Sequence, residues 1–314
     1  MYKVDNYING EGCSVSNESS KIINPSYGTQ IGEVLYANNE SANRAVDAAY
    51  EASKLWAKTG LSYRAELILK FRQGIINRST EIVDICVSEA GKTRPDAEAE
   101  LDRAVQALTH ASAVQHFLTT NFSQNVAGGI DIADLRFPIG VIAGVGPFNF
   151  PILIPILHSA MAIVTGNTYI AKPSEKVPSI SRLFADIWNA AGLPDGCFNV
   201  LNGQKEIVEL LVRHEKVAGL AFIGSTAAAK SLKMLGVEHN TKVQALGGGK
   251  NHMIVLPDAD LDMSADAAVS ASFGAAGQRC MAVSVVVAVG DIADELISKI
   301  QTRIPNLVMG VTDD

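Results

Sequence analysis

Residues 140–151 read Gly-Val-Ile-Ala-Gly-Val-Gly-Pro-Phe-Asn-Phe-Pro and open the part of the chain that decides the fold. Their apolar start predicts a buried strand at 140–145, the prolines predict a tight turn, and the run 152–164 predicts a buried helix. Further strands are predicted at 167–172, 197–201, 218–223, 242–246 and 252–256, with helices at 178–191, 204–213 and 226–235. This alternation is typical of a parallel sheet covered on both faces, the doubly wound α/β class.

The residues before this unit have a different character. Residues 1–36 predict short strands, with turns at Asn9-Gly10 and at 24–28. Residues 40–116 show helical periodicity. Residues 121–137, with Gly128-Gly129 at their centre, predict an exposed hairpin that leaves the compact body and serves oligomerisation.

The composition excludes several classes of protein. The chain has 314 residues, 47% of them hydrophobic, and a net charge of −7 without a basic stripe, which argues against nucleic-acid binding. Four scattered cysteines and an N-terminus without targeting features predict a reducing, cytoplasmic compartment, and six isolated histidines predict no metal site. Residues 138–166 lack charge, but their repeated prolines would break a membrane-spanning helix, so we expect no membrane span.

Polar residues follow the predicted strands, at the edge where a doubly wound sheet binds ligands. Gly144 and Gly146 begin a dinucleotide fingerprint, but Asn149 stands where the third glycine belongs. Lys172 and Glu175 could hold a ribose or a phosphate, with a solvated turn as an equally weighted alternative.

The next two strand ends carry weaker signals. Ser225 opens a helix, where it could receive a phosphate, although a plain N-cap is the commoner role of a single serine. Residues 247–252, Gly-Gly-Gly-Lys-Asn-His, alone predict only a turn.

Cys280 ends the run Ser272-Phe-Gly-Ala-Ala-Gly-Gln-Arg-Cys, just before the β-branched residues 282–289, which predict a buried strand. Gly274 and Gly277 allow close backbone approach, and Arg279 can favour a thiolate. On these residues alone a buried structural cysteine is the more frequent outcome, and a nucleophile is the alternative.

The order of these motifs resembles that of the aldehyde dehydrogenase superfamily. The motifs are Pro-Phe-Asn-Phe-Pro (147–151), Lys-Pro-Ser-Glu (172–175), Phe-Ile-Gly-Ser-Thr (222–226), Gly-Gly-Gly-Lys-Asn (247–251) and Gly-Gln-Arg-Cys (277–280). The resemblance spans the chain and is greatest to the CoA-acylating methylmalonate-semialdehyde dehydrogenases. It implies a Rossmann-type NAD-binding core at 138–250, preceded by its N-terminal strands and helices (1–120) and the oligomerisation hairpin (121–137), and the start of a second α/β catalytic domain at 251–314.

The resemblance also implies roles for matching residues. Cys280 would attack the aldehyde, and Asn149 would stabilise the oxyanion. Lys172 and Glu175 would hold the adenosine ribose of NAD, which is favoured over NADP because a carboxylate repels a 2′-phosphate. Ser225 would contact the pyrophosphate. Gly146, Phe148, Lys176 and Gly247 would line the rest of the cofactor.

The substrate implied is methylmalonate or malonate semialdehyde, whose carboxylate an arginine can hold bidentately. Arg103, on a predicted helix, and Arg279 are the candidates, and a solvated helix face is the alternative for Arg103. Leu246 stands where hydrolytic relatives carry a general-base glutamate. We therefore expect transfer to CoA, with propionyl-CoA or acetyl-CoA, CO₂ and NADH as products.

Two other functions stay open: a hydrolytic NAD-dependent aldehyde dehydrogenase, and an inactive nucleotide-binding fragment. The chain ends at Asp314, short of the usual length of the family, so we expect a fragment or truncated gene product. A full-length form is expected to be a homo-oligomer, either a dimer or a tetramer.

Overall fold

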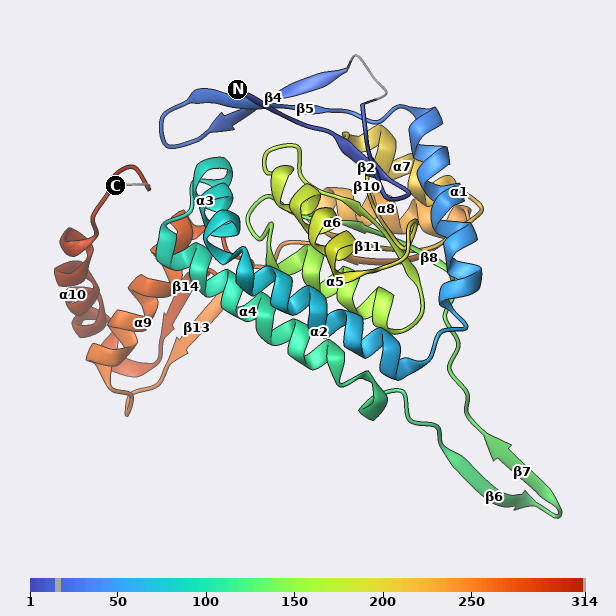
Figure 1. The fold of residues 1–314 in the computed structure, drawn as a ribbon. Coiled ribbons are helices and arrows are strands. Elements are labelled where there is room, and N and C mark those ends of the chain that lie inside the picture. The colour runs from blue at the N-terminus through green and yellow to red at the C-terminus, as the bar shows by residue number, and fades with distance from the viewer. Residues whose placement is uncertain (15–17, 313–314) are drawn as a thin grey trace.

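A central parallel sheet organises the computed structural model, which describes residues 1–14 and 18–312 (Figure 1). The sheet has seven strands in the order β12-β11-β8-β9-β10-β2-β3. Its parallel strands are β8 (Val141–Val145), β9 (Thr168–Lys172), β10 (Phe198–Val200), β11 (Val217–Ile223) and β12 (Lys242–Leu246). The N-terminal strands β2 (Asn6–Ile8) and β3 (Glu11–Cys13) extend it in antiparallel fashion. The predicted doubly wound sheet is confirmed.

Helices bury both faces of this sheet in two separate hydrophobic cores. On one face lie α5 (Leu153–Val164) and α6 (Ser179–Ala191), and an outer layer of α2 (Leu61–Asn77), α3 (Ser79–Ala90) and α4 (Arg94–Ser112) completes the same core. The other face packs against α1 (Asn39–Trp56), α7 (Lys205–Arg213) and α8 (Thr226–Glu238). In the first core the rings of Phe71 and Trp188 stack with centroids 3.8 Å apart, so α2 and α6 are held together by aromatic contact.

Gly144 lies in the middle of this packing, on β8. A Cβ atom at this position would lie 1.7 Å from Oη of the buried Tyr169 on β9. The glycine is therefore required by the contact between neighbouring strands. This explains why the Gly144-x-Gly146 pattern resembles a dinucleotide fingerprint without completing one.

The N-terminal strands and the hairpin have the form predicted for them. Asn9 and Gly10 have φ of 52° and 87° and form the turn between β2 and β3. The strands β1 (Tyr2–Val4), β5 (Thr29–Leu35) and β4 (Ser19–Asn24) form a separate sheet. A short 3₁₀ helix, η1 (Val114–His116), precedes the hairpin of β6 (Phe122–Ala127) and β7 (Ile130–Ala133), which is exposed throughout and projects from the body (Figure 1).

The strand expected at 252–256 is not part of the central sheet. It forms β13 (Asn251–Val255) and pairs in parallel with β14 (Val283–Ala288) in a second, two-stranded sheet. One face of that sheet packs on α9 (Leu261–Phe273) and α10 (Ala293–Arg303), but Ile254 on the other is 66% exposed. No residue of β14 itself is fully buried, and Val287 is 40% exposed, so the prediction of a buried strand at 282–289 is wrong in its burial, because β-branched residues indicate a strand but not what covers it.

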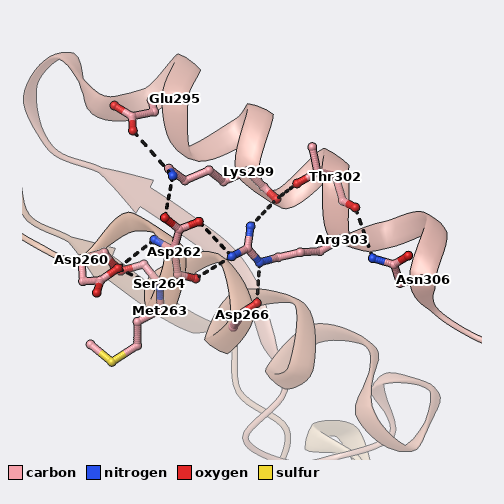
Figure 2. Close-up of polar contacts among 10 residues, drawn as sticks. All are labelled: Asp260, Asp262, Met263, Ser264, Asp266, Glu295, Lys299, Thr302, Arg303 and Asn306. Carbon is pink, nitrogen blue, oxygen red and sulfur yellow. Dashed lines mark hydrogen bonds and ion pairs between the residues drawn. The ribbon is translucent and has the colours of Figure 1, made fainter.

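Ion pairs link the two helices of this second unit (Figure 2). Lys299 and Arg303 of α10 contact Asp262 of α9 at 2.7 and 3.0 Å, and Arg303 also pairs with Asp266. Three short 3₁₀ helices complete the unit: η2 (Gly274–Gly277), η3 (Gly290–Ile292) and η4 (Ile304–Asn306). The aspartates are exposed, so we attribute most of the stability here to apolar contact between the helices.

Residues 138–166 divide into β8, a turn and α5, as predicted. Among the helices of the described residues, none has the length and apolar character needed to cross a membrane.

Gly144→Ala should lower the free energy of unfolding by about 3 kcal/mol, because a methyl group here forces the buried Tyr169 to move. Urea unfolding followed by tryptophan fluorescence measures the change. Gly128→Ala is the matched control, since Gly128 lies in the exposed hairpin with open space around its Cβ position. Equal midpoints for the two variants would contradict the packing role.

Candidate active site

Cys280 lies in the loop between η2 and β14, and its side chain is exposed rather than buried in a core. The thiol opens onto a groove of about 690 Å³. One face of α4, the start of α5 and the Cys280 loop line this groove, through Lys92, Asp96, Glu100, Arg103, His110, Phe150, Leu153, Ala275, Arg279 and Met281 among others. Cys280 thus has the access that a nucleophile needs, which a structural cysteine in a core would lack.

The backbone before Cys280 is unusual. Ala275, Ala276 and Gly277 have successive φ values of 51°, 53° and 72°, a left-handed region that costs alanine on the order of 1 kcal/mol or more. The side chain of Asn251 holds the loop on its far side, where Nδ2 donates to the carbonyl oxygens of Cys280 at 2.9 Å and Ala282 at 3.0 Å. The position of the thiol is therefore set by contacts from β13 as well as by its own loop.

Asn149 meets the same loop from the central sheet. Its Nδ2 donates to the carbonyl oxygen of Gln278 at 2.8 Å, two residues before the thiol. A side-chain amide carries two N–H donors, so one remains for an oxyanion. The structure brings together the loop that carries Cys280 and the turn that carries Asn149, which the sequence separates by more than a hundred residues.

The two candidate arginines both line the groove, but their surroundings differ. Arg279 pairs with Asp96 at 2.5 Å and packs across Gly274, where a Cβ atom would lie 2.6 Å from its guanidinium. Within the described residues, Arg103 forms no hydrogen bond or ion pair. Of the two, Arg103 has the fork of donors available for a carboxylate, while Arg279 ties the Cys280 loop to α4.

A second cavity, of about 680 Å³, lies at the carboxyl ends of β8, β9 and β11, against α7 and α8. Lys172 and Glu175 line it together, as the sequence predicts. Lys172 is 6% exposed, and burial lowers the pKa of its ammonium group. Its Nζ lies 3.8 Å from Glu175 Oε2, beyond direct hydrogen-bond length, so the ammonium keeps donors for ligand hydroxyls. This arrangement fits the ribose of an adenine nucleotide.

Two other predicted cofactor positions, Phe148 and Lys176, line a third cavity. This smaller cavity of about 450 Å³ is also lined by Glu175 and Gln278, and Lys176 Nζ lies 4.8 Å from the centroid of the Phe148 ring. The backbone N–H of Gly146 donates to the carbonyl oxygen of Lys172 at 3.1 Å. Phe148 and Lys176 therefore share a cavity with Glu175 and with Gln278 of the Cys280 loop, and Gly146 lies next to Lys172.

Ser225 and Gly247 lie side by side at the ends of β11 and β12. The hydroxyl of Ser225 accepts from the N–H of Ala228 at 3.3 Å, so it is the N-cap of α8. A Cβ atom on Gly247 would lie 3.0 Å from Thr226, the residue after Ser225. Neither residue lines the cavities described above, so their cofactor contacts stay predictions.

Several residues of the site escaped prediction from the sequence, among them Asp96, the ion-pair partner of Arg279. Lys92 and Glu100 line the Cys280 groove as a buried ion pair, and Asn251 fixes the loop. The signal for Asn251 was its place in the Lys-Asn-His motif. For Lys92 and Glu100 the only signal was their eight-residue spacing, and spacing does not distinguish a buried pair from a solvated one. Among residues 1–14 and 18–312, no group of three or more His, Cys, Asp and Glu side chains could hold a metal ion.

Comparisons with known proteins agree with this geometry. A malonate-semialdehyde dehydrogenase of Pseudomonas aeruginosa is 40% identical over 99% of this chain and 63% of its own length. A crystal structure of methylmalonate-semialdehyde dehydrogenase from Oceanimonas doudoroffii superposes with a TM-score of 0.97 at 37% identity, over 100% of this chain and 64% of its own. An NAD complex from Sinorhizobium meliloti 1021, assigned to the same activity, gives 0.96 at 37% identity over the same shares.

The chain thus spans slightly less than two thirds of the length of these relatives. The model of the aldehyde dehydrogenase family matches residues 13–314, which include every strand end and loop of the site. The chain belongs to the aldehyde dehydrogenase family.

Proposed function

We propose that this chain supplies the cofactor site and the nucleophile of an NAD-dependent dehydrogenase for malonate or methylmalonate semialdehyde that transfers the acyl group to CoA. The observation that carries the proposal is that the amide of Asn149 contacts the loop of Cys280, whose thiol shares a groove with Arg103, which has no polar partner among the described residues. The names of the relatives and the NAD in one of them support it.

In this proposal the thiolate of Cys280 attacks the aldehyde carbon, and the negative charge develops on the former carbonyl oxygen. The free N–H of Asn149 donates to that oxygen, and because Asn149 is fixed on Gln278 it needs no reorientation. NAD, when bound, accepts the hydride. Loss of that hydride leaves a thioester on Cys280. Lys172 and Glu175 would hold the cofactor by its ribose, in the cavity at the carboxyl ends of β8, β9 and β11.

Release of the acyl group depends on the end of β12. Leu246 is 51% exposed there, with its register fixed by pairing with Ile223. A leucine cannot take a proton from water, so hydrolysis lacks a general base at this position. A thiolate such as that of CoA attacks a thioester without one. The β-carboxylate of a malonate-type acyl group leaves as CO₂, with the electrons accepted by the thioester carbonyl.

The assembly and setting of the enzyme belong to the same proposal. The apolar side chains of Phe122, Ile130 and Ile132 on the exposed hairpin suit a contact with a second copy, in a homodimer or homotetramer. All four cysteines are free, in keeping with a reducing cytoplasm. We also propose the division into an NAD-binding part, 1–120 with 138–250, and a catalytic part, 251–314.

The proposal is tested by NADH formation from malonate semialdehyde, with and without CoA. We expect turnover that requires CoA, because Leu246 cannot activate water. Leu246→Glu should increase CoA-independent turnover. Undiminished turnover of the unaltered chain without CoA would favour the hydrolytic alternative, and NAD binding without any turnover would favour the nucleotide-binding fragment.

Cys280 should react first with iodoacetamide at pH 7.5 in the native chain. Burial raises the pKa of both Cys86 and Cys197 to about 12, so these thiols are shielded and protonated. Mass spectrometry of proteolytic peptides measures the order of labelling. Cys280→Ser should abolish the fast phase, and a fast phase that persists in this variant would overturn the assignment.

Arg103→Ala should reduce kcat/KM for malonate semialdehyde about 100-fold and leave that for propanal nearly unchanged, because only the former carries a carboxylate. Arg103→Lys is the matched control, since it keeps the charge but loses the bidentate fork, and it should retain part of the preference. A preference that is unchanged in Arg103→Ala would show that Arg103 is not the anchor.

A further inference from the structure

A buried ion pair, Lys92 with Glu100, lines the groove that also contains Cys280. Lys92 and Glu100 are 8% and 3% exposed, and Lys92 Nζ lies 2.5 Å from Glu100 Oε2. The same ammonium lies 4.3 Å from the centroid of the Phe150 ring. Because Glu100 neutralises its charge and Phe150 covers it, Lys92 is poorly placed to bind a substrate carboxylate itself. The ion pair therefore has a structural role.

The contacts of the second carboxylate oxygen of Glu100 indicate that role. Oε1 accepts hydrogen bonds from the backbone N–H groups of Ile152 and Leu153, both at 2.8 Å. These groups stand at the start of α5, where N–H donors have no partner inside the helix. Ile152, the N-cap residue, offers no side-chain cap of its own. Glu100 therefore caps α5 from α4.

This cap has a direct bearing on Asn149. Only Phe150 and Pro151 separate Asn149 from Ile152, so the ion pair contacts the chain immediately after Asn149. Lys92 contacts Phe150 and Glu100 contacts Ile152, which leaves the turn little freedom to rotate. On its other side Asn149 donates to Gln278.

We propose that Glu100, held in place by Lys92, is a positioning residue that orients Asn149 as the oxyanion donor. The effect of Glu100 on catalysis rests on the proposed function, whereas its positioning of Asn149 does not. The proposal has two parts that can be tested separately. Removal of Glu100 loosens the start of α5, and the resulting decrease in kcat arises because Asn149 is no longer oriented.

The first claim is tested by hydrogen–deuterium exchange of the full 314-residue chain. Glu100→Ala should increase amide exchange at Ile152 and Leu153, while Glu100→Gln, which keeps an acceptor oxygen, should restore much of the protection. Lys92→Met tests the contribution of the cation with a side chain of similar length, and it should give an intermediate increase. Unchanged exchange of the 150–154 segment in Glu100→Ala would overturn the proposal.

Glu89→Ala is the matched control for general loosening. Glu89 is also a buried carboxylate at a helix start, where it accepts from the N–H of Ser179 at 3.3 Å. Its removal should increase exchange near Ser179 at the start of α6 and leave residues 150–154 protected. Equal increases at both places in both variants would mean that Glu100 acts only on global stability.

The second claim is tested by a double-mutant cycle on kcat for NADH formation. Asn149→Ala and Glu100→Ala should each lower kcat about 10- to 100-fold, with little change in the KM for NAD. Glu100→Ala should have almost no further effect in the Asn149→Ala background. Multiplicative effects would refute action through Asn149. A wild-type chain that forms no NADH would refute the proposed function, and the exchange measurement would still decide the positioning.

Discussion

A parallel sheet has to bury both of its faces, and this requirement governs where the chain can bind a ligand. The two helical cores close the faces of the central sheet, so its polar backbone is open mainly at the strand ends. The carboxyl ends of β8, β9 and β11 meet at one edge, where the cavity beside Lys172 and Glu175 lies. The position of the proposed cofactor site is thus a consequence of covering the sheet, and the strand-end motifs lie there for the same reason.

Helix α4 connects this sheet to the loop of Cys280, the proposed nucleophile. Asp96, Glu100 and Arg103 are spaced by four and three residues and therefore share one face of the helix. Asp96 holds Arg279 of the Cys280 loop, Glu100 holds the start of α5, and Arg103 faces the groove without a partner in the part of the chain that the structure describes. One straight element therefore sets the distance between the thiol loop and the Asn149 turn, which two separate loops could not do.

The sequence predicted most of the fold, because apolar periodicity and turn residues act locally. Each strand expected at 140–246 exists in the central sheet. The strand at 251–255 was predicted as a strand but assigned to the wrong sheet, since periodicity carries no information about the partner. For the same reason, the sequence did not reveal that Lys92 and Glu100 form a buried ion pair. Whether a charged helix residue is buried is decided by a neighbour far along the chain, here the start of α5.

The left-handed backbone at Ala275 and Ala276 also depends on contacts from residues far along the chain. Alanine rarely adopts these φ angles, so contacts outside the turn have to hold the backbone in this conformation. Asn251 and Asn149 hold the carbonyl groups of Cys280 and Gln278, and Asp96 holds the side chain of Arg279. An oxyanion at Asn149 would use the second N–H of the amide and leave the bond to Gln278 intact. On the proposed function, binding of the transition state therefore need not release the contact that holds the Cys280 loop.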